Sequence, residues 1–173
     1  MIRPATAQDL DAIARIYDEI LTEEEKRPQS YTNWQRGKYP TMDTARNALA
    51  AGWLWVAEDE GDLHSAVILN DVQLPEYDAI PWQFEAERDK VGVIHTLVIS
   101  PRHAGTGKGR EMVDFCEAEC RRRGMTVMRL DTYEGNLPAN AMYPKLGYRL
   151  AGATEFFFQG FIHEILNCYE KAL

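Results

Sequence analysis

The sequence predicts a single α/β domain over residues 1–173, with a mixed central sheet of about six to seven strands flanked by about four helices. Segments with strand-like and helix-like spacing of apolar residues alternate along the chain, a pattern typical of this fold class. A chain of 173 residues with 45% hydrophobic residues can bury one sizeable core but is short for two ordinary domains. No repeat, low-complexity tract or linker-like segment divides it.

The N-terminal segment predicts a short strand followed by a helix. Ile2 and Arg3 begin the strand, and Thr6 is a residue type that caps helices. The apolar positions after it keep helical spacing at Leu10, Ile13, Ala14, Tyr17, Ile20 and Leu21. The chain therefore opens with a strand and then an amphipathic helix.

A second helix and a hairpin follow. The helix is expected over about 42–51, with Gly52 as its C-cap. Residues 53–57 and 63–69 have the composition of two strands, and the turn-forming residues between them predict a hairpin.

Two connections, 22–40 and 71–90, are rich in aromatic residues. Their aromatic side chains include Tyr31, Trp34 and Tyr39 in the first and Tyr77 and Trp82 in the second. A connection as long as 71–90 is usually functional or mobile in a compact domain, so it is a candidate lid. For any single aromatic residue, the simpler interpretation is that it covers the sheet.

A glycine-rich loop follows a strand-like run that ends near Ile99 and precedes an amphipathic helix with Met112, Val113, Cys116 and Cys120 on one face. Its glycines are Gly105, Gly107 and Gly109. At a helix N-terminus the unpaired N–H groups and the helix dipole favour an anion, and glycine allows its close approach. The loop therefore predicts a phosphate site, although a helix start without a ligand fits the same residues.

Two familiar phosphate loops do not match these residues. The Walker pattern needs glycine where this chain has Arg102, and Ser or Thr where it has Gly109. The dinucleotide fingerprint needs a third glycine where this chain has Arg110. The loop residues alone do not identify the anion.

The C-terminal third predicts one helix among three strands. Residues 127–132 form the first strand, and Pro138 begins a helix that ends at Gly147. The aromatic and β-branched residues from Tyr148 to Tyr169 are sufficient for two more strands.

Composition argues against nucleic-acid and membrane partners. The net charge is −8 and the pI is near 5.0, whereas nucleic-acid binding depends on clustered Lys and Arg. The one basic run, 121–123, lies where a helix ends, four residues after Glu117 and Glu119. No apolar run approaches the length of a membrane span, and the N-terminus lacks a secretory hydrophobic stretch. We therefore expect a soluble, cytoplasmic protein.

The cysteine and histidine spacings predict neither a disulfide framework nor a metal site. Cys116 and Cys120 lie on the apolar side of a helix and Cys168 lies in a late strand, so they are expected to be core residues. The other candidate ligands are His64, His103 and His163, which have no metal-ligand spacing.

The order of elements, the glycine loop and the run from Asn136 to Tyr148 together resemble the GCN5-related N-acetyltransferase (GNAT) superfamily. The resemblance covers nearly the whole chain and is strongest from His95 to Tyr148. It implies that acetyl-CoA lies between the strand ending near Ile99 and the strand over 127–132, which splay apart.

The resemblance also implies which residues contact the coenzyme. Main-chain groups of Leu97 and Ile99 would pair with the pantetheine arm, and the N–H of Val98 would stabilise the oxyanion. Asn136 and Ala139 would line the pantetheine side. The pyrophosphate would bind the loop residues Ala104, Gly105, Thr106, Gly107, Lys108 and Gly109, with Arg110 behind them.

The loop departs from the family pattern at Ala104, where Arg or Gln is usual. In that register Gly107 and Gly109 match the pattern. A second register starts at Arg102 and uses Gly105 and Gly107.

Acetyl transfer needs an unprotonated amine, a stabilised oxyanion and an acid for the leaving thiolate. With the resemblance, Tyr143 is the candidate acid, because a phenol with a pKa near 10 can protonate a thiolate. Its alternative role is packing in the apolar stripe of its helix. His95 is the candidate base, acting directly or through water, and its alternative is a core histidine. Asp131 is a weaker candidate that could orient a group or bind an amine.

The resulting hypothesis is an acetyl-CoA-dependent N-acetyltransferase that passes the acetyl group directly to a primary amine of a small molecule or peptide. Buried cysteines disfavour a covalent route. The alternative is a catalytically silent acyl-CoA-binding regulatory module. The acceptor is expected to enter beside residues 22–40 and 71–90, and the sequence leaves its identity and a homodimer open.

Overall fold

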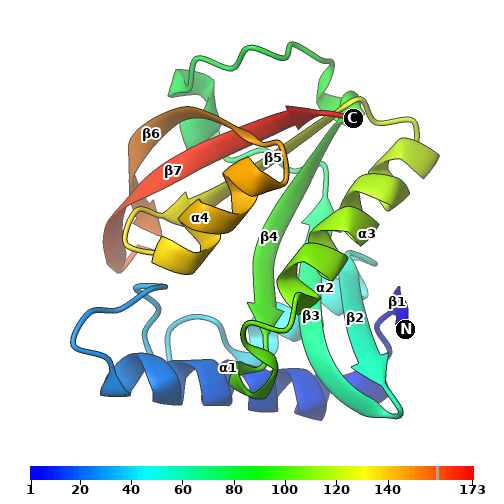
Figure 1. Ribbon diagram of the computed structural model, residues 1–173, viewed down its shortest axis with the longest axis vertical. Coiled ribbons are helices and arrows are strands. Elements are labelled where there is room, and N and C mark those ends of the chain that lie inside the picture. Colours follow the sequence, from blue (N-terminus) through cyan, green and yellow to red (C-terminus); the bar gives the residue numbers. More distant parts are fainter. Residues whose placement is uncertain (159) are drawn as a thin grey trace. The chain divides into compact units, whose positions relative to one another are not determined.

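The computed structural model describes residues 1–158 and 160–173. Its strands form one sheet in the order β1-β2-β3-β4-β5-β7-β6 (Figure 1). The strands are β1 (Ile2–Pro4), β2 (Leu54–Asp59), β3 (Asp62–Asn70), β4 (Val91–Ile99), β5 (Val127–Tyr133), β6 (Arg149–Phe158) and β7 (Ile162–Ala172). The pair β4 and β5 is parallel, whereas β1–β2, β2–β3, β5–β7 and β6–β7 are antiparallel. The predicted mixed sheet is confirmed.

The α-helices of the described residues also match the predicted number. They are α1 (Leu10–Lys26), α2 (Met42–Ala50), α3 (Lys108–Arg122) and α4 (Leu137–Lys145). Within the two described ranges, no helix has the length and apolar character that a bilayer crossing requires.

The chain divides into two compact units, which we describe separately. The first unit comprises Met1–Pro28, Trp34–Leu69 and His95–Phe115. The second comprises Gln29–Asn33, Asn70–Ile94 and Cys116–Leu173. Each unit has its own cluster of buried apolar side chains.

The entry to α1 is fixed by an ion pair and a turn. Asp9 accepts hydrogen bonds from the Thr6 N–H at 2.7 Å and from the Arg3 guanidinium at 2.8 and 2.9 Å. The hydrogen bonds from Arg3 lower the pKa of Asp9 to about 2, so its carboxylate stays charged. The following turns of α1 bury Ile13, Ile16 and Tyr17 in the core of the first unit.

The hairpin of the first unit supplies the rest of this core. Leu54, Val56 and Ala66 of β2 and β3 are at most 3% exposed and belong to the same cluster as the α1 residues. Helix α2 ends as predicted, because Gly52 follows it with φ +74°, a backbone conformation that glycine adopts without strain.

In the second unit, β5 lies between β4 and β7. The parallel register with β4 covers Val91–Ile94 opposite 127–130. The antiparallel register with β7 extends over all of β5, from Val127 opposite Ala172 to Tyr133 opposite Leu166. The last three residues of β5 are therefore paired only with β7 among the described register pairs.

The basic run at the end of α3 makes the local ion pairs that its spacing predicts. Arg121 pairs with Glu117 at 3.3 Å, and Arg123 pairs with Glu119 at 2.8 Å. The charges of this run are thus engaged within the second unit.

The connection 71–90 is packed against the second core, which differs from the expected lid. Tyr77 is 2% exposed and Ile80 is 6% exposed, and both belong to the same apolar cluster as Val91 and Val93. Trp82 lies edge-on to Tyr77, and the Trp82 indole N–H donates to the Tyr77 carbonyl at 2.8 Å. The aromatic residues of this segment therefore serve mainly as core.

Candidate active site

The glycine loop lies in the first unit between β4 and α3. Gly105 and Gly107 have φ values of +74° and +85°, and a side chain at either position would meet open space. The glycines are therefore required by backbone conformation and not by crowding. Helix α3 begins at Lys108, which places Gly109 in its first turn.

The loop presents N–H groups at the start of α3. Within the described residues, no protein acceptor is found for the N–H groups of Gly107, Lys108, Gly109 and Arg110, while the N–H of Glu111 donates to the Gly107 carbonyl. These are the donors that a helix N-terminus leaves unpaired. Together with the helix dipole they form a site that favours an anion.

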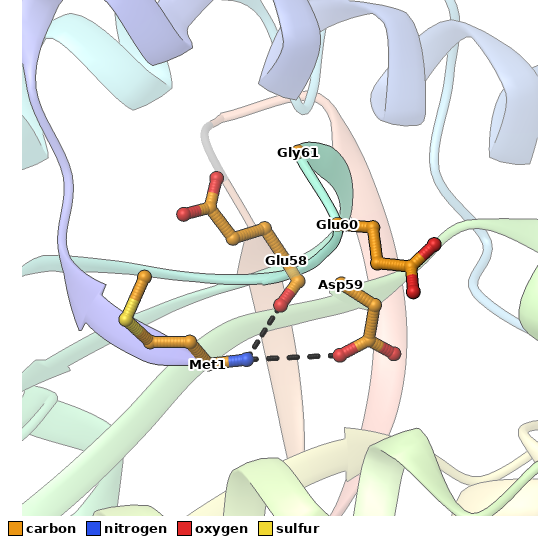
Figure 2. A pocket seen from close by; sticks show the side chains of 5 residues that line it. All are labelled: Met1, Glu58, Asp59, Glu60 and Gly61. Carbon is orange, nitrogen blue, oxygen red and sulfur yellow. Dashed lines mark hydrogen bonds and ion pairs between the residues drawn. The ribbon is translucent and has the colours of Figure 1, made fainter.

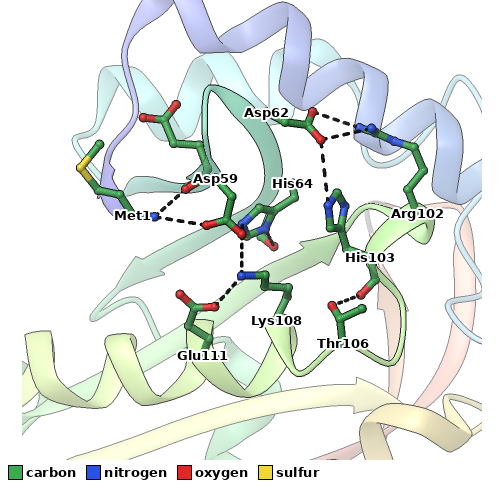
Figure 3. Close-up of polar contacts among 11 residues, drawn as sticks. Met1, Asp59, Asp62, His64, Arg102, His103, Thr106, Lys108 and Glu111 are labelled. Atoms are coloured by element: carbon green, nitrogen blue, oxygen red, sulfur yellow. Dashed lines mark hydrogen bonds and ion pairs between the residues drawn. The ribbon is translucent and has the colours of Figure 1, made fainter.

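The side chain of Lys108 is held in an ion-pair network of the first unit (Figure 3). Its ammonium lies 2.8 Å from Asp59 and 3.1 Å from Glu111. Lys108 therefore ties the start of α3 to the hairpin between β2 and β3. An anion at the loop would be bound by N–H groups while this cation is already neutralised.

Arg102 is engaged on the other side of the loop. Its guanidinium pairs with Asp62 at 3.3 Å (Figure 3). It also pairs with Glu19 at 3.4 Å. Glu19 also accepts a hydrogen bond from the Ser100 hydroxyl at 2.6 Å. Arg102 thus supports the loop from α1, and Ala104 leaves the usual Arg or Gln position without a polar group.

A surface pocket at the β2–β3 turn lies outside the predicted site. It is lined by Met1, Glu58, Asp59, Glu60 and Gly61 (Figure 2). The terminal amine of Met1 is bonded to the Glu58 carbonyl and lies 3.6 Å from Asp59. None of the predicted catalytic or coenzyme residues lines this pocket.

The strand residues predicted to contact the coenzyme follow a local irregularity in β4. Thr96 has φ +44°, a conformation that is strained for a β-branched residue, and its hydroxyl is bonded to that of Tyr39. His95 and Leu97 flank it and are partly buried, whereas Val98 is 1% exposed. The sequence contained no indication of this conformation at Thr96.

Helix α4 of the second unit begins with the predicted Asn136, whose side chain has a structural role. The side-chain oxygen Oδ1 of Asn136 accepts a hydrogen bond from the Ala139 N–H at 3.1 Å and so caps the helix. Pro138 lies in the first turn, where its missing N–H costs nothing.

Asn140, which the sequence analysis did not single out, fixes α4 to strands β5 and β7. Its side-chain carbonyl accepts hydrogen bonds from Asn167 at 2.9 Å and from the Tyr169 hydroxyl at 2.8 Å. Its amide donates to the Tyr133 carbonyl at 3.0 Å. These bonds position the helix that carries Tyr143.

Tyr143 is 5% exposed and packs against the rings of Tyr148 and Tyr169 at 5.7 and 5.5 Å. Its hydroxyl makes no hydrogen bond within the part of the chain that the structure describes. Burial raises the pKa of Tyr143 well above its usual value, with Asp131 adding to the shift. The phenol is therefore protonated at neutral pH and donates to no acceptor among the described residues.

Asp131 lies in the same unit, bonded to the buried Tyr77. The Tyr77 hydroxyl donates to Asp131 Oδ2 at 2.6 Å. Burial raises the pKa of Asp131 to about 6, although the hydrogen bond from Tyr77 opposes that shift. Glu164 of β7, which the sequence analysis missed, is a second buried carboxylate, and burial raises its pKa to about 7.

The three cysteines are reduced and buried. Burial raises the pKa of Cys120 to about 11 and of Cys168 to about 12, and that of Cys116 further still. A thiolate nucleophile is thus disfavoured at all three positions. In the described residues, no group of three or more His, Cys, Asp or Glu side chains is arranged to hold a metal ion.

The predicted site residues are divided between the two units. His95, the strand 97–99 and the loop 104–110 belong to the first unit. Asn136, Ala139 and Tyr143 belong to the second.

The model of the acetyltransferase (GNAT) family matches residues 11–148 of the sequence. The chain belongs to this family. As a GNAT protein it is an N-acetyltransferase, and the predicted family and fold are confirmed. An N-acetyltransferase of Bacillus subtilis (strain 168) named YesJ, itself uncharacterized, is 24% identical over 166 residues, which are 94% of this chain and 88% of that protein.

Solved GNAT structures share the fold. A GNAT-family acetyltransferase from Streptococcus agalactiae 2603 matches with a TM-score of 0.81 and 23% identity, covering 100% of this chain and 95% of that chain. The yncA protein from Salmonella typhimurium, solved with its cofactor acetyl-CoA, matches with a TM-score of 0.71 and 19% identity, covering 100% of this chain and 93% of that one.

Proposed function

We propose that this GNAT N-acetyltransferase uses acetyl-CoA and transfers the acetyl group directly to a primary amine. The observation that carries the proposal is the start of α3, where Gly107 and the residues after it present N–H groups that have no acceptor within residues 1–158 and 160–173. Such a loop suits a pyrophosphate. The solved relative that contains acetyl-CoA supports the choice of coenzyme.

Each catalytic role is assigned to a residue of this chain. His95 takes a proton from the acceptor ammonium, directly or through water, so that the amine nitrogen can attack the thioester carbonyl. The C–N bond forms and the C–S bond breaks. The N–H of Val98 stabilises the oxyanion, and Tyr143 donates its proton to the departing thiolate.

The raised pKa of Tyr143 keeps the proton on the phenol until the thiolate forms, and it also makes the phenol a weaker acid than an exposed tyrosine. A phenol with its ordinary pKa near 10 was expected from the sequence, and burial keeps the phenol protonated over a wider pH range. Tyr143 thus carries its proton when the C–S bond breaks, and the second proton lost by the amine nitrogen restores the phenol after its own proton has passed to the thiolate. The raised pKa values of the buried cysteines favour a ternary complex over an acetylated cysteine.

The test is a free-thiol release assay with acetyl-CoA across a panel of primary amines. We expect Tyr143→Phe to reduce kcat by about 10²-fold or more and to leave the KM for acetyl-CoA nearly unchanged. Tyr148→Phe, in the neighbouring ring, is the matched control and should retain turnover. His95→Ala should lose activity most strongly at low pH, where the amine is protonated.

Two outcomes would overturn parts of the proposal. Wild-type protein that binds coenzyme A yet releases no thiol with any amine would favour the silent acyl-CoA-binding module. Full turnover in both Tyr143→Phe and His95→Ala would remove their catalytic roles while leaving the family membership intact.

A further inference from the structure

Two carboxylates of the second unit lie on one face of the β5–β7 ladder. Asp131 is directly opposite Cys168 in the antiparallel register, so the two side chains share a face. Glu164 is four residues before Cys168 along β7, and an even separation keeps it on that same face. At 3.4 Å per residue, roughly 14 Å of strand separates the Cα atoms of Glu164 and Cys168.

Glu164 is buried without a counter-ion. It is 7% exposed, and its one hydrogen bond within the described residues comes from the Asn33 amide to Oε2 at 3.3 Å. Its second oxygen, Oε1, accepts no hydrogen bond from the described part of the chain. A buried carboxylate is costly unless its lone pairs and charge are matched.

Asp131 likewise has no counter-ion among the described residues. Its one hydrogen bond from the described residues is donated by the neutral Tyr77 hydroxyl at 2.6 Å. No Lys, Arg or His side chain in residues 1–158 or 160–173 forms an ion pair with either carboxylate. Asn33 and Tyr77 thus give neutral hydrogen-bond donors to the two carboxylates. No described side chain supplies the positive charge that would balance them.

The pKa shift of Glu164 agrees with its lack of a counter-ion. Burial raises the pKa of Glu164 to about 7, and the negative charge of Asp131 adds to the shift. The charge of Asp131 also contributes to the raised pKa of Tyr143. A cation bound at either carboxylate would favour the ionised form of that carboxylate.

We propose that Glu164 and Asp131, with Asn33 and Tyr77 as neutral partners, bind the cationic end of the acceptor. The acceptor class is then a primary amine that carries a second positive charge, with a flexible diamine as the simplest member. In this assignment Glu164 holds the ammonium that does not react, and Asp131 adds a second negative charge on the same face of the ladder. This inference rests on the proposed acetyl transfer to an amine.

The test compares two acceptors that differ by one charge, 1,4-diaminobutane and butylamine, in the thiol-release assay. We expect the wild-type kcat/KM to be at least tenfold higher for the diamine. Glu164→Gln should remove that preference by raising the KM for the diamine about tenfold, with the butylamine values unchanged. Glu155→Gln, an exposed carboxylate of the neighbouring β6, should change neither substrate.

A binding readout separates this inference from the proposed function. We expect 1,4-diaminobutane to raise the Tm of the wild-type protein without acetyl-CoA and to have no such effect on Glu164→Gln. Asp131→Asn provides a second variant if Glu164→Gln does not fold, and it should lower the diamine preference in the same direction.

The outcomes are distinguishable. Absence of thiol release with every amine defeats the proposed function, while a Tm shift that needs Glu164 still supports the cation site. Turnover of butylamine and diamine at equal efficiency, with no Tm shift, overturns the cation site and leaves the acetyl transfer standing. An equal loss of both substrates in Glu164→Gln also overturns it, because the residue would then be structural.

Discussion

The hydroxyl groups of Tyr39 and Thr96 are hydrogen-bonded to each other across 57 residues of sequence. Thr96 needs this support, because a β-branched residue with φ +44° is strained. The strand residues that follow it, Leu97 and Val98, are those assigned to the coenzyme arm and the oxyanion. A contact from the connection before α2 thus sets the local shape of β4.

Removing this contact has a predictable cost. Tyr39→Phe should lower the free energy of unfolding by about 1 kcal/mol and reduce kcat several-fold, because Thr96 loses its partner. Tyr17→Phe is the matched control, since the Tyr17 hydroxyl is buried with no partner among the described residues. The control should be neutral or slightly stabilising in urea denaturation. Equal losses in the two variants would contradict the role given to Tyr39.

A comparison of Gly107→Ala with Gly61→Ala separates an effect on coenzyme binding from the effect of backbone strain. Both have nearly the same φ, +85° and +84°, and both face open space. Each change to Ala should cost about 1 kcal/mol of stability. Only Gly107→Ala should also raise the KM for acetyl-CoA, by about tenfold, because relief of its backbone strain would displace the N–H groups of the proposed pyrophosphate site. A KM that is unchanged in Gly107→Ala would exclude the loop from coenzyme binding.

Asn140 should matter for both stability and turnover. Asn140→Ala removes an acceptor shared by Asn167 and Tyr169 and a donor to the Tyr133 carbonyl. The free energy of unfolding should fall by about 2–3 kcal/mol, because three partners, among them the buried Tyr169, lose their bonds. Turnover should fall as well, since α4 carries Tyr143. Asn167→Ala removes one of these bonds and should cost less in the same thermal and kinetic measurements.

The buried Glu164 predicts a specific pH dependence of stability. Its pKa is raised from 4.5 in the unfolded chain to about 7 in the folded one, so the folded protein binds more protons between these values. Stability therefore falls as pH rises through about 4.5 to 7. Glu164→Gln should gain up to about 3 kcal/mol over wild type at pH 8 and little at pH 4.

Chemical denaturation at several pH values measures this difference. Glu155→Gln should follow the wild-type curve, because Glu155 is exposed. A gain for Glu164→Gln that is the same at pH 4 and pH 8 would show that burial of the charge is not its cause.

Much of the fold could be predicted because the relevant information is local. Apolar spacing indicated α1 and α3, and the glycines after α2 and α4 indicated where those helices end, as Gly52 and Gly147 confirm with φ values of +74° and +86°. The candidate coenzyme and acid positions came from two motifs that lie close to each other in the sequence.

The parts that were missed depend on contacts between distant segments. Thr96 has a residue type that favours ordinary strand geometry, so its left-handed backbone has no local cue. Glu164 obtains its neutral partner from Asn33, 131 residues earlier. The connection 71–90 resembled a lid by length and composition, but Tyr77 and Ile80 are core residues.

The three buried cysteines should give a low background signal in the free-thiol release assay. Thiol reagents act on thiolates, and the raised pKa values of Cys120 and Cys168 leave almost none at neutral pH. Any thiol that appears quickly in the native reaction should therefore come from coenzyme A. Labelling of the cysteines themselves would instead report opening of the second unit, so one reagent can follow both turnover and unfolding.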